Sequence, residues 1–478
     1  MPYPTIAMNI DGEWVREGAA GARDVLNPAD GQTVGSVPLA DAAQLDAAAE
    51  AAKRAFASWR GTSPRDRSRL LRAGAERIRD RAEDLATIMT LEQGKPRLEA
   101  KGELLVSADV LDWYAEEGRR AYGRIVPGAS NVRQLVTHEP VGPAAAFTPW
   151  NFPALTPARK IAAALASGCT LVLKAAEETP ATAMALVAAL VDAGLPPGVL
   201  QLVFGDPAFV SERLIAAPEV RKVSFTGSVA VGKLLMAQAA QGVKRTTMEL
   251  GGHAPVIICD DVDPARVARL LVAGKFRNAG QVCISPSRFY VQDGVYDAFC
   301  EAFVDGAKAL IVGDGSRADV TMGPLANDRR LGAMEAFVED ARERGGKVRT
   351  GGARGANGGY FFDPTVVTDL ADDARLLIDE PFGPVAPIAR FGRLEEALAR
   401  ANSLPVGLAA YGFTNSNGRA MTIGNELKAG MVGLNTLAVS TPETPFGGVG
   451  ESGHGQEGGL EGLAAYLDVK FIAHAAEA

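Results

Sequence analysis

The spacing of apolar residues differs between successive parts of the chain. Between Asp41 and Ala121, apolar residues recur at helical spacing among many Ala, Arg and Glu residues, most clearly over 44–59 and 65–91. This spacing places the apolar side chains on one face of a helix. We therefore expect a mainly helical segment in this part of the chain.

Short apolar runs alternate with helical stretches in the part that follows. These runs cover 171–173, 200–204, 223–225 and 246–250. Strands that alternate with helices are typical of βαβ units, which build a parallel sheet. A second alternation begins at 254–258 and continues past Gly430. The pattern therefore predicts a second α/β domain.

Composition narrows the class of protein. A chain of 478 residues exceeds the size at which one hydrophobic core stops growing, so we expect at least two domains. The net charge of -8 argues against a nucleic-acid partner or an anionic membrane surface. Four cysteines without a paired spacing fit a reducing compartment. Because the chain shows neither a signal-peptide pattern nor ~18 consecutive apolar residues, we expect a cytoplasmic protein without a membrane partner.

One cysteine stands in a segment that is unlike a buried core. Cys283 follows Gly280 and precedes Ser285, which indicates an irregular backbone after a helix predicted over 264–278. The other three cysteines fit the usual place of a free cysteine, which is the apolar interior. Glu249 lies upstream, directly before a Leu-Gly-Gly sequence. A thiol and a carboxyl on separate glycine-rich segments can act as a nucleophile and its base.

These two segments occur together with three other short motifs. The five motifs cover 147–153, 174–177, 249–252, 278–285 and 380–384. In their order and spacing they resemble the signatures of the NAD(P)-dependent aldehyde dehydrogenase superfamily, and most of all those of succinate semialdehyde dehydrogenases. The resemblance runs from about Ile10 to Phe471. It implies an α/β fold with a Rossmann-type nucleotide-binding domain, an α/β catalytic domain and a small β oligomerisation extension.

The resemblance also implies a division of the chain. We assign the nucleotide-binding domain to 1–122 and 141–248, the catalytic domain to 249–445, and the oligomerisation extension with the C-terminal tail to 123–140 and 446–478. In the family, this extension pairs with the end of the chain in a neighbouring subunit, for which 123–139 and 468–472 are the candidates here. We therefore expect a homodimer or homotetramer. The alternative is a hairpin folded on its own domain, although isolated two-stranded ribbons are marginally stable.

A glycine turn at 227–233 is the predicted diphosphate site. Gly227 and Ser228 follow a predicted strand and open a helix, whose free N–H groups and dipole suit a pyrophosphate. The segment also spells GxxxxGK, but Leu234 stands where an ATP-binding loop needs a hydroxyl for magnesium, so we reject that reading. The GxGxxG match at 448–453 follows a proline-containing segment instead of a strand, and we expect a turn there.

The remaining coenzyme residues rest on the resemblance. Lys174 and Glu177 match the pair that holds the adenosine ribose, and a carboxylate there favours NAD, with NADP less preferred because its 2′-phosphate would be repelled. Glu380 and Phe382 match the residues that hold the nicotinamide ribose and pack on the ring, and Trp150 belongs to the same predicted site. The alternative for Lys174 and Glu177 is a solvated pair of charges at a strand end.

The resemblance assigns the reaction to three residues. Cys283 would add to the aldehyde as a thiolate, which requires activation because a thiol with a pKa near ~8.5 is mostly protonated at neutral pH. Glu249 would be the base and would also activate the water that hydrolyses the thioester. Asn151 and the backbone N–H of Cys283 would bind the oxyanion. The alternatives are a capping or salt-bridged carboxylate for Glu249 and a turn residue for Asn151.

Three further residues indicate the aldehyde. Arg159, Arg277 and Ser440 match the carboxylate-binding residues of succinate semialdehyde dehydrogenases, and a guanidinium binds a carboxylate through two hydrogen bonds. Succinate semialdehyde is the predicted substrate, with α-ketoglutarate semialdehyde next and an aromatic or aliphatic aldehyde third. Ser285 replaces the second cysteine of a redox-sensitive pair, so no disulfide switch is expected. No metal is expected either, because the four histidines are scattered.

Overall fold

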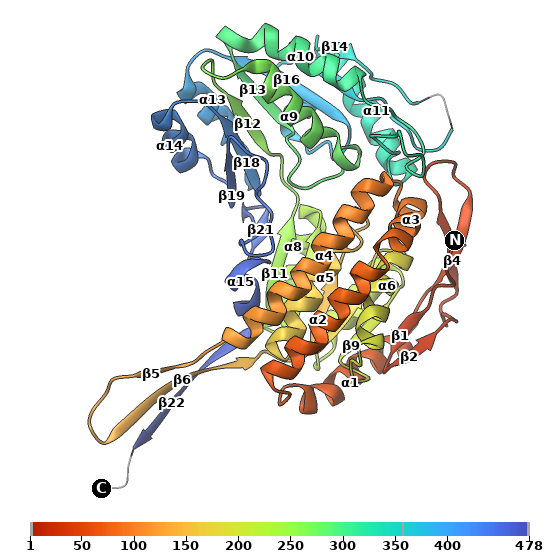
Figure 1. Ribbon diagram of the computed structural model, residues 1–478, viewed down its shortest axis with the longest axis vertical. Helices are drawn as coiled ribbons and strands as arrows, with labels where there is room; N and C mark the ends of the chain where they lie inside the picture. Colours follow the sequence, from red (N-terminus) through yellow and green to blue (C-terminus); the bar gives the residue numbers. More distant parts are fainter. Residues whose placement is uncertain (1–2, 356–357, 476–478) are drawn as a thin grey trace.

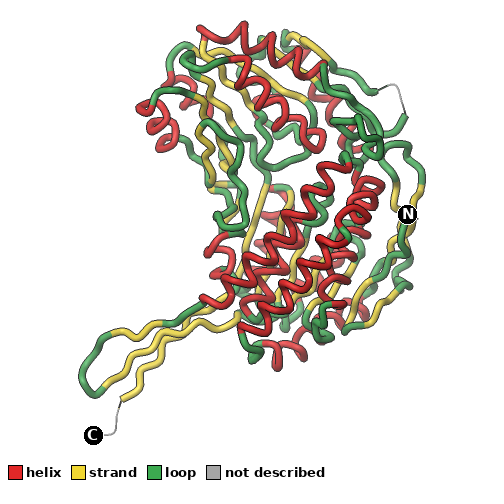
Figure 2. The backbone as a smooth tube through the Cα atoms, viewed as in Figure 1, coloured by secondary structure: helices red, strands yellow, loops and turns green. Residues whose placement is uncertain are grey.

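The computed structural model describes residues 3–355 and 358–475. Two α/β units lie one above the other, and a three-stranded sheet projects from the lower one (Figure 1). In each unit the strands form a sheet and the helices cover it (Figure 2). None of the helices within the described residues combines the length and the apolar character that a membrane crossing needs.

The lower unit is built on an eight-stranded sheet in the order β2-β1-β9-β8-β7-β10-β11-β21. Its strands are β1 (Met8–Ile10), β2 (Glu13–Val15), β7 (Ala144–Phe147), β8 (Leu171–Lys174), β9 (Leu200–Val203), β10 (Lys222–Gly227), β11 (Arg245–Leu250) and β21 (Gly453–His454). The five strands from β7 to β11 run parallel, while β1, β2 and β21 add antiparallel edges. The predicted parallel sheet is therefore confirmed.

Of the described helices, eight that precede β11 in the chain accompany this sheet. They are α1 (Ala42–Trp59), α2 (Pro64–Asp80), α3 (Ala82–Gln93), α4 (Arg97–Glu117), α5 (Leu155–Ser167), α6 (Pro180–Asp192), α7 (Pro207–Ala216) and α8 (Val229–Gln241). The helical spacing over 65–91 corresponds to two helices, because Arg81 leaves the helical conformation at φ −107° and ψ 9°. Each helix buries an apolar face of its own, so apolar spacing continued across the break.

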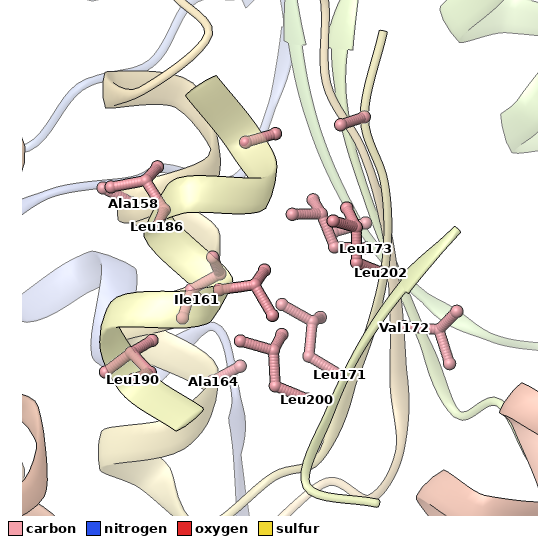
Figure 3. Packing of buried hydrophobic residues seen from close by; sticks show 14 of the residues in the cluster. Ala158, Ile161, Ala164, Leu171, Val172, Leu173, Leu186, Leu190, Leu200 and Leu202 are labelled. Carbon is pink, nitrogen blue, oxygen red and sulfur yellow. The ribbon is translucent and has the colours of Figure 1, made fainter. Parts of the chain in front are cut away.

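The side chains of the central strands alternate between the two faces of the sheet. Leu171 and Leu173 point toward α5 and α6, where they meet Leu200 and Leu202 of β9, while Val172 points to the opposite face (Figure 3). All five side chains are buried. Burying one such side chain contributes about 1.5–3 kcal/mol, so both faces of this sheet stabilise the unit. A sheet covered on both faces also explains the continuous apolar run 171–173 of β8.

The upper unit contains a seven-stranded sheet in the order β14-β15-β16-β13-β12-β18-β19, parallel except for β14. Its strands are β12 (Pro255–Ile258), β13 (Arg288–Gln292), β14 (Lys347–Thr350), β15 (Thr365–Thr368), β16 (Val385–Phe391), β18 (Ala409–Phe413) and β19 (Met431–Leu434). Its helices are α9 (Pro264–Phe276), α10 (Tyr296–Lys308), α11 (Asp328–Glu343), α12 (Arg375–Ile378), α13 (Leu394–Ala401) and α14 (Asn417–Glu426). Asp263 caps α9 by accepting from the N–H groups of Ala265 and Arg266.

The projecting sheet corrects one prediction. It consists of β5 (Arg124–Val126), β6 (Val132–Pro140) and β22 (Leu467–Ala475), and β6 pairs with β22 of the same chain along its whole length. The prediction that 123–139 pairs with the chain end of a neighbouring subunit is therefore wrong for these strands. The chain returns to β6 directly after α15 (Gly459–Ala464), which packs on α5.

The segment before β22 lies outside the projecting sheet. Within 446–475, β22 lies in the projecting sheet, whereas β21 joins the eight-stranded sheet and α15 packs on α5, as parts of the C-terminal tail. Residues 476–478 lie outside the described residues. The GxGxxG match joins β20 (Val449–Gly450) to β21 by a turn, as expected. The remaining short elements are β3 (Ala22–Leu26), β4 (Thr33–Pro38), β17 (Val406–Gly407), η1 (Gly118–Arg120), η2 (Arg277–Gly280) and η3 (Asp293–Val295).

Candidate active site

The predicted site residues gather where the two units face each other. Asn151, Lys174, Gly227 and Glu249 lie at or just after the carboxyl ends of β7, β8, β10 and β11. Open parallel sheets bind ligands at this edge. The upper unit contributes the loop of Cys283, which opens into a cavity of about 480 Å³. Its lining includes Phe152, Arg159, Thr226, Arg277, Tyr411, Leu437, Ser440, Phe446 and Glu457.

The backbone before Cys283 is strained. Asn278, Ala279 and Gly280 have φ values of 49°, 51° and 74°, so three successive residues are left-handed. Such a conformation costs a non-glycine residue about 1 to 3 kcal/mol and persists only where its surroundings enforce it. A Cβ on Gly280 would lie 2.2 Å from the carbonyl oxygen of Gly383, so only glycine fits there. This turn ends the helix predicted over 264–278 early, at Phe276.

The Cys283 thiol needs a base. Burial, and then the charge of Glu380, raise the pKa of Cys283 to about 12, while Arg159 and Arg277 act in the opposite direction. The thiol is therefore protonated at neutral pH in the free protein. Its side chain is partly exposed, unlike the other three cysteines, which are buried. Exposure to the cavity and a strained loop separate Cys283 from cysteines that fill a core.

Glu249 is a buried carboxyl group near this thiol. Neither of its carboxyl oxygens has a hydrogen-bond partner among the described residues. Burial, and then the charge of Glu457, raise the pKa of Glu249 well above its usual range. The capping and salt-bridge alternatives for Glu249 are therefore wrong. A carboxylate with a raised pKa takes a proton more readily than an ordinary one, which suits a general base.

A buried ion pair close to Glu249 was not predicted from the sequence. Lys160 on α5 pairs with Glu457 and donates a second hydrogen bond to Ser224 Oγ at 3.0 Å. Glu457 lies in the segment between β21 and α15 and lines the cavity. The two partners are separated by 297 residues, and neither belongs to a motif, so no local pattern in the sequence could reveal the pair.

Asn151 is held against the Cys283 loop. Its Nδ2 donates to the carbonyl oxygen of Gln281, two residues before Cys283, at 3.0 Å. An amide nitrogen carries two hydrogens, so the second one is available to a substrate oxygen. The side chain is buried and bridges the two units instead of serving a local turn. The geometry thus fits a donor for a developing oxyanion.

The coenzyme candidates line the edge of the eight-stranded sheet. Lys174 Nζ lies 2.7 Å from Glu177 Oε2, and Glu177 Oε1 accepts from the backbone N–H of Gly205 at 3.1 Å. Both side chains are buried, so the interpretation as a solvated charge pair is wrong. Gly227 ends β10, and Ser228 caps α8 by accepting from the N–H of Val231 at 3.4 Å. Ser228 and Ala230 are exposed, so the start of α8 is open to an anionic group.

The upper unit contributes the other two coenzyme candidates, Glu380 and Phe382. A Cβ on Gly251 would lie 2.5 Å from Glu380 Oε2, so the glycine makes room for that carboxyl group. Burial raises the pKa of Glu380 to about 8, while the Gly252 N–H and nearby cations act in the opposite direction. Phe382 meets Trp150 edge to face, with ring centroids 5.8 Å apart. This edge thus offers two carboxyl groups for the riboses, a helix start for the diphosphate and an aromatic contact for the ring. Together these features fit a nicotinamide dinucleotide.

The predicted substrate residues meet in the cavity. Arg159 donates to Ser440 Oγ at 2.7 Å, and its guanidinium lies 4.2 Å from the ring centroid of Phe446. Its Nε has no partner among the described residues, so one donor of a buried guanidinium is unused. The guanidinium carbon of Arg277 lies 5.4 Å from the ring centroid of Phe152, and Arg277 is more exposed than Arg159. Arg159 is therefore a buried cation and not a surface one. Within 3–355 and 358–475, no three His, Cys, Asp or Glu side chains gather as a metal site requires.

Comparisons with known proteins identify the class. The chain matches the aldehyde dehydrogenase family over residues 14–472 and belongs to that family. It is 47% identical to 4-(hydroxymethyl)benzenesulfonate dehydrogenase from Comamonas testosteroni over 98% of each chain. It is 43% identical to an NADP(+)-type succinate-semialdehyde dehydrogenase of Escherichia coli over 97% of this chain and 96% of that protein. The crystal structure of succinate-semialdehyde dehydrogenase from Burkholderia pseudomallei superposes with a TM-score of 0.97 at 43% identity, covering 98% of each chain. The family and the fold predicted from the motifs are confirmed.

Proposed function

We propose that this protein oxidises an aldehyde with a distal anionic group, with NAD as the coenzyme, and that succinate semialdehyde is the substrate and succinate the product. The observation that carries the proposal is the cavity in front of Cys283. Its lining includes the buried guanidinium of Arg159, fixed by Ser440, and a second guanidinium from Arg277. An arginine that is held and has an unused donor favours an anionic partner.

The residues of the site divide the reaction between them. Glu249 takes the proton of Cys283 and passes it to solvent, and the Cys283 sulfur adds to the aldehyde carbon. The product is a thiohemiacetal alkoxide, whose oxygen accepts a hydrogen bond from Asn151 Nδ2. The carbon then loses a hydride and becomes a thioester of Cys283. When bound, the coenzyme accepts this hydride. Glu249 next takes a proton from water, which attacks the thioester and releases the carboxylic acid and the thiol.

The coenzyme assignment rests on Lys174, Glu177 and Gly205. A carboxylate at this position accepts hydrogen bonds from both hydroxyls of an adenosine ribose and repels a 2′-phosphate. The Escherichia coli relative is named for NADP(+), so a NAD preference would set this chain apart from it. Trp150, Gly227, Ser228, Glu380 and Phe382 complete the proposed coenzyme site.

Replacing Glu177 by serine is expected to narrow or reverse the preference for NAD. The change removes both the repulsion of the 2′-phosphate and an acceptor for the ribose hydroxyls, so activity with NAD falls and activity with NADP rises. The ratio of kcat/KM for the two coenzymes measures this. Glu178→Ser is the matched control, because Glu178 is the next residue and pairs with Arg329 on the surface. An unchanged ratio in Glu177→Ser would remove Glu177 from the coenzyme site.

An anionic aromatic aldehyde is the second candidate substrate. The relatives are named for 4-(hydroxymethyl)benzenesulfonate, succinate semialdehyde or glutarate semialdehyde, and each of these compounds carries a sulfonate or a carboxylate. Phe152, Tyr411 and Phe446 line the cavity, and aromatic walls suit a flat ring as well as a short chain. The α-ketoglutarate semialdehyde also carries the required anion. A panel of these aldehydes with each coenzyme decides between them.

Arg159→Ala is expected to lower kcat/KM for succinate semialdehyde by a factor that corresponds to ~2 to ~5 kcal/mol of lost transition-state stabilisation. The reason is that the carboxylate of the bound substrate loses its guanidinium partner. Butanal has the same chain length without the carboxylate and should be nearly unaffected. Arg277→Ala should show the same selectivity with a smaller loss, since a more exposed charge is screened by water. Equal losses on both aldehydes would mean that the arginines support the loops and do not bind the anion.

We also propose a homo-oligomer in the cytoplasm. The projecting sheet exposes apolar side chains, including Ile125, Val469 and Phe471, which a second copy would cover. The nucleotide-binding role of the lower unit and the catalytic role of the upper unit are part of the same proposal.

A further inference from the structure

The connection between α3 and α4 carries buried charges that the proposed reaction does not use. Lys95 lies in this connection, and its Nζ is 2.5 Å from Glu103 Oε2 on α4. Both side chains are almost fully buried. Burial lowers the pKa of Lys95. A buried ion pair is a poor source of stability, because desolvation offsets much of the attraction. The role of the pair is therefore better inferred from the groups that it contacts than from a contribution to stability.

The pair holds the segment that follows β7. Lys95 Nζ donates to the carbonyl oxygen of Asn151 at 2.8 Å and lies 4.3 Å from the ring centroid of Phe152. Glu103 Oε1 accepts from the N–H groups of Ala154 and Leu155, at 2.8 and 3.1 Å, at the start of α5. Residues 151–155 are thus fixed at both ends by one ion pair.

The end of α3 and the start of α4, on either side of this connection, also hold the strained loop before Cys283. Gln93 Nε2 donates to Asn278 Oδ1 at 2.9 Å, and Glu99 Oε2 accepts from the Asn278 N–H at 2.8 Å. Asn278 Nδ2 in turn donates to the Asn151 carbonyl at 2.9 Å. The Asn151 carbonyl oxygen therefore accepts from both Lys95 and Asn278, and its peptide group is held from two sides.

We propose that Lys95, paired with Glu103, is a positioning residue that fixes the Asn151 backbone, so that Asn151 Nδ2 stays aimed at the oxygen of the reacting aldehyde. Lys95 acts through Asn151, without touching the reacting atoms. This inference rests on the proposed function, since it gives Lys95 a part in the same site. A displacement of about 1 Å in such a donor can lower a rate about 100-fold.

A double-mutant cycle between Lys95 and Asn151 tests the inference. In the wild-type background, Lys95→Met should lower kcat about 10- to 100-fold, with the dissociation constant for NAD unchanged. Asn151→Ala should lower kcat about 100- to 1000-fold. In the Asn151→Ala background, Lys95→Met should lower kcat no further, because the group that it positions is already absent. Equal losses in both backgrounds, or wild-type kcat in Lys95→Met, would overturn the proposal.

Two further variants separate position from folding. Lys95→Met/Glu103→Gln removes the carboxylate that the single change leaves unpaired and replaces the single variant if that one does not fold. Arg67→Met is the matched control, because Arg67 is a buried cation that donates to the Ala166 carbonyl at the other end of α5. It should lower the melting temperature and keep kcat. A wild-type protein that oxidises no aldehyde would refute the proposed function itself, whereas additive losses in an active enzyme refute only the role of Lys95.

Discussion

Cys283→Ala is expected to abolish aldehyde oxidation while leaving coenzyme binding intact. The change removes the sulfur that forms the thiohemiacetal, and the residues at the start of α8 and at Lys174 and Glu177 are untouched. Loss of a catalytic nucleophile typically lowers kcat by several orders of magnitude, so turnover should fall below about one per cent of wild type. NADH formation measures the activity, and calorimetric titration with NAD measures binding.

A second cysteine supplies the control for this experiment. Cys259→Ala removes a thiol that is buried in the upper unit, at 1% exposure, and should keep wild-type activity at a small cost in stability. If Cys283→Ala kept more than about one per cent of the wild-type turnover, Cys283 would not be the nucleophile.

Glu249→Gln is expected to slow the release of the acid. An amide cannot take a proton from water, so the thioester of Cys283 accumulates and a burst of NADH precedes slow turnover. Because the proposed reaction also uses Glu249 to deprotonate Cys283, the burst should be slower than the first turnover of the wild-type protein. Because burial raises the pKa of Glu249, the wild-type rate should rise with pH as Glu249 loses its proton, and this limb of the profile should be absent in the variant.

The control for Glu249 is another buried carboxyl group. Glu117→Gln, at a side chain paired with Arg120 at the end of α4, should keep both the burst and the pH profile. Wild-type turnover and an unchanged pH profile in Glu249→Gln would remove Glu249 from the reaction.

The sequence predicted the sheets and helices where apolar spacing was regular. β8 is buried on both faces and its apolar run is unbroken, so it was easy to place, although Gln201 interrupts the run of β9. The strands β1 to β4 were missed, because they are short and β2 to β4 are largely exposed. The partner of β6 was misplaced because strand pairing between residues 132–140 and 467–475 depends on the path of the whole chain.

The site was predicted as far as its residues belong to local motifs. Cys283, Glu249 and Asn151 each lie in a short glycine- or proline-rich segment, and the structure brings these segments together. Lys95 lies in the connection between α3 and α4, and Lys160 lies on α5. Neither belongs to a motif, so their contacts with Asn151 and Glu457 emerge only from the tertiary structure. The state of Glu249 also depends on burial and on Glu457, which a sequence pattern does not contain.

The most direct test of the proposed chemistry is mass spectrometry of the Glu249→Gln protein, quenched in acid after mixing with NAD and succinate semialdehyde. Accumulation of the thioester would add one succinyl group to the peptide that contains Cys283, and the adduct would require NAD and be removed by hydroxylamine. A burst of NADH with the acyl group on another residue, or with no covalent adduct at all, would contradict the assignment of Cys283 as the residue that carries the substrate.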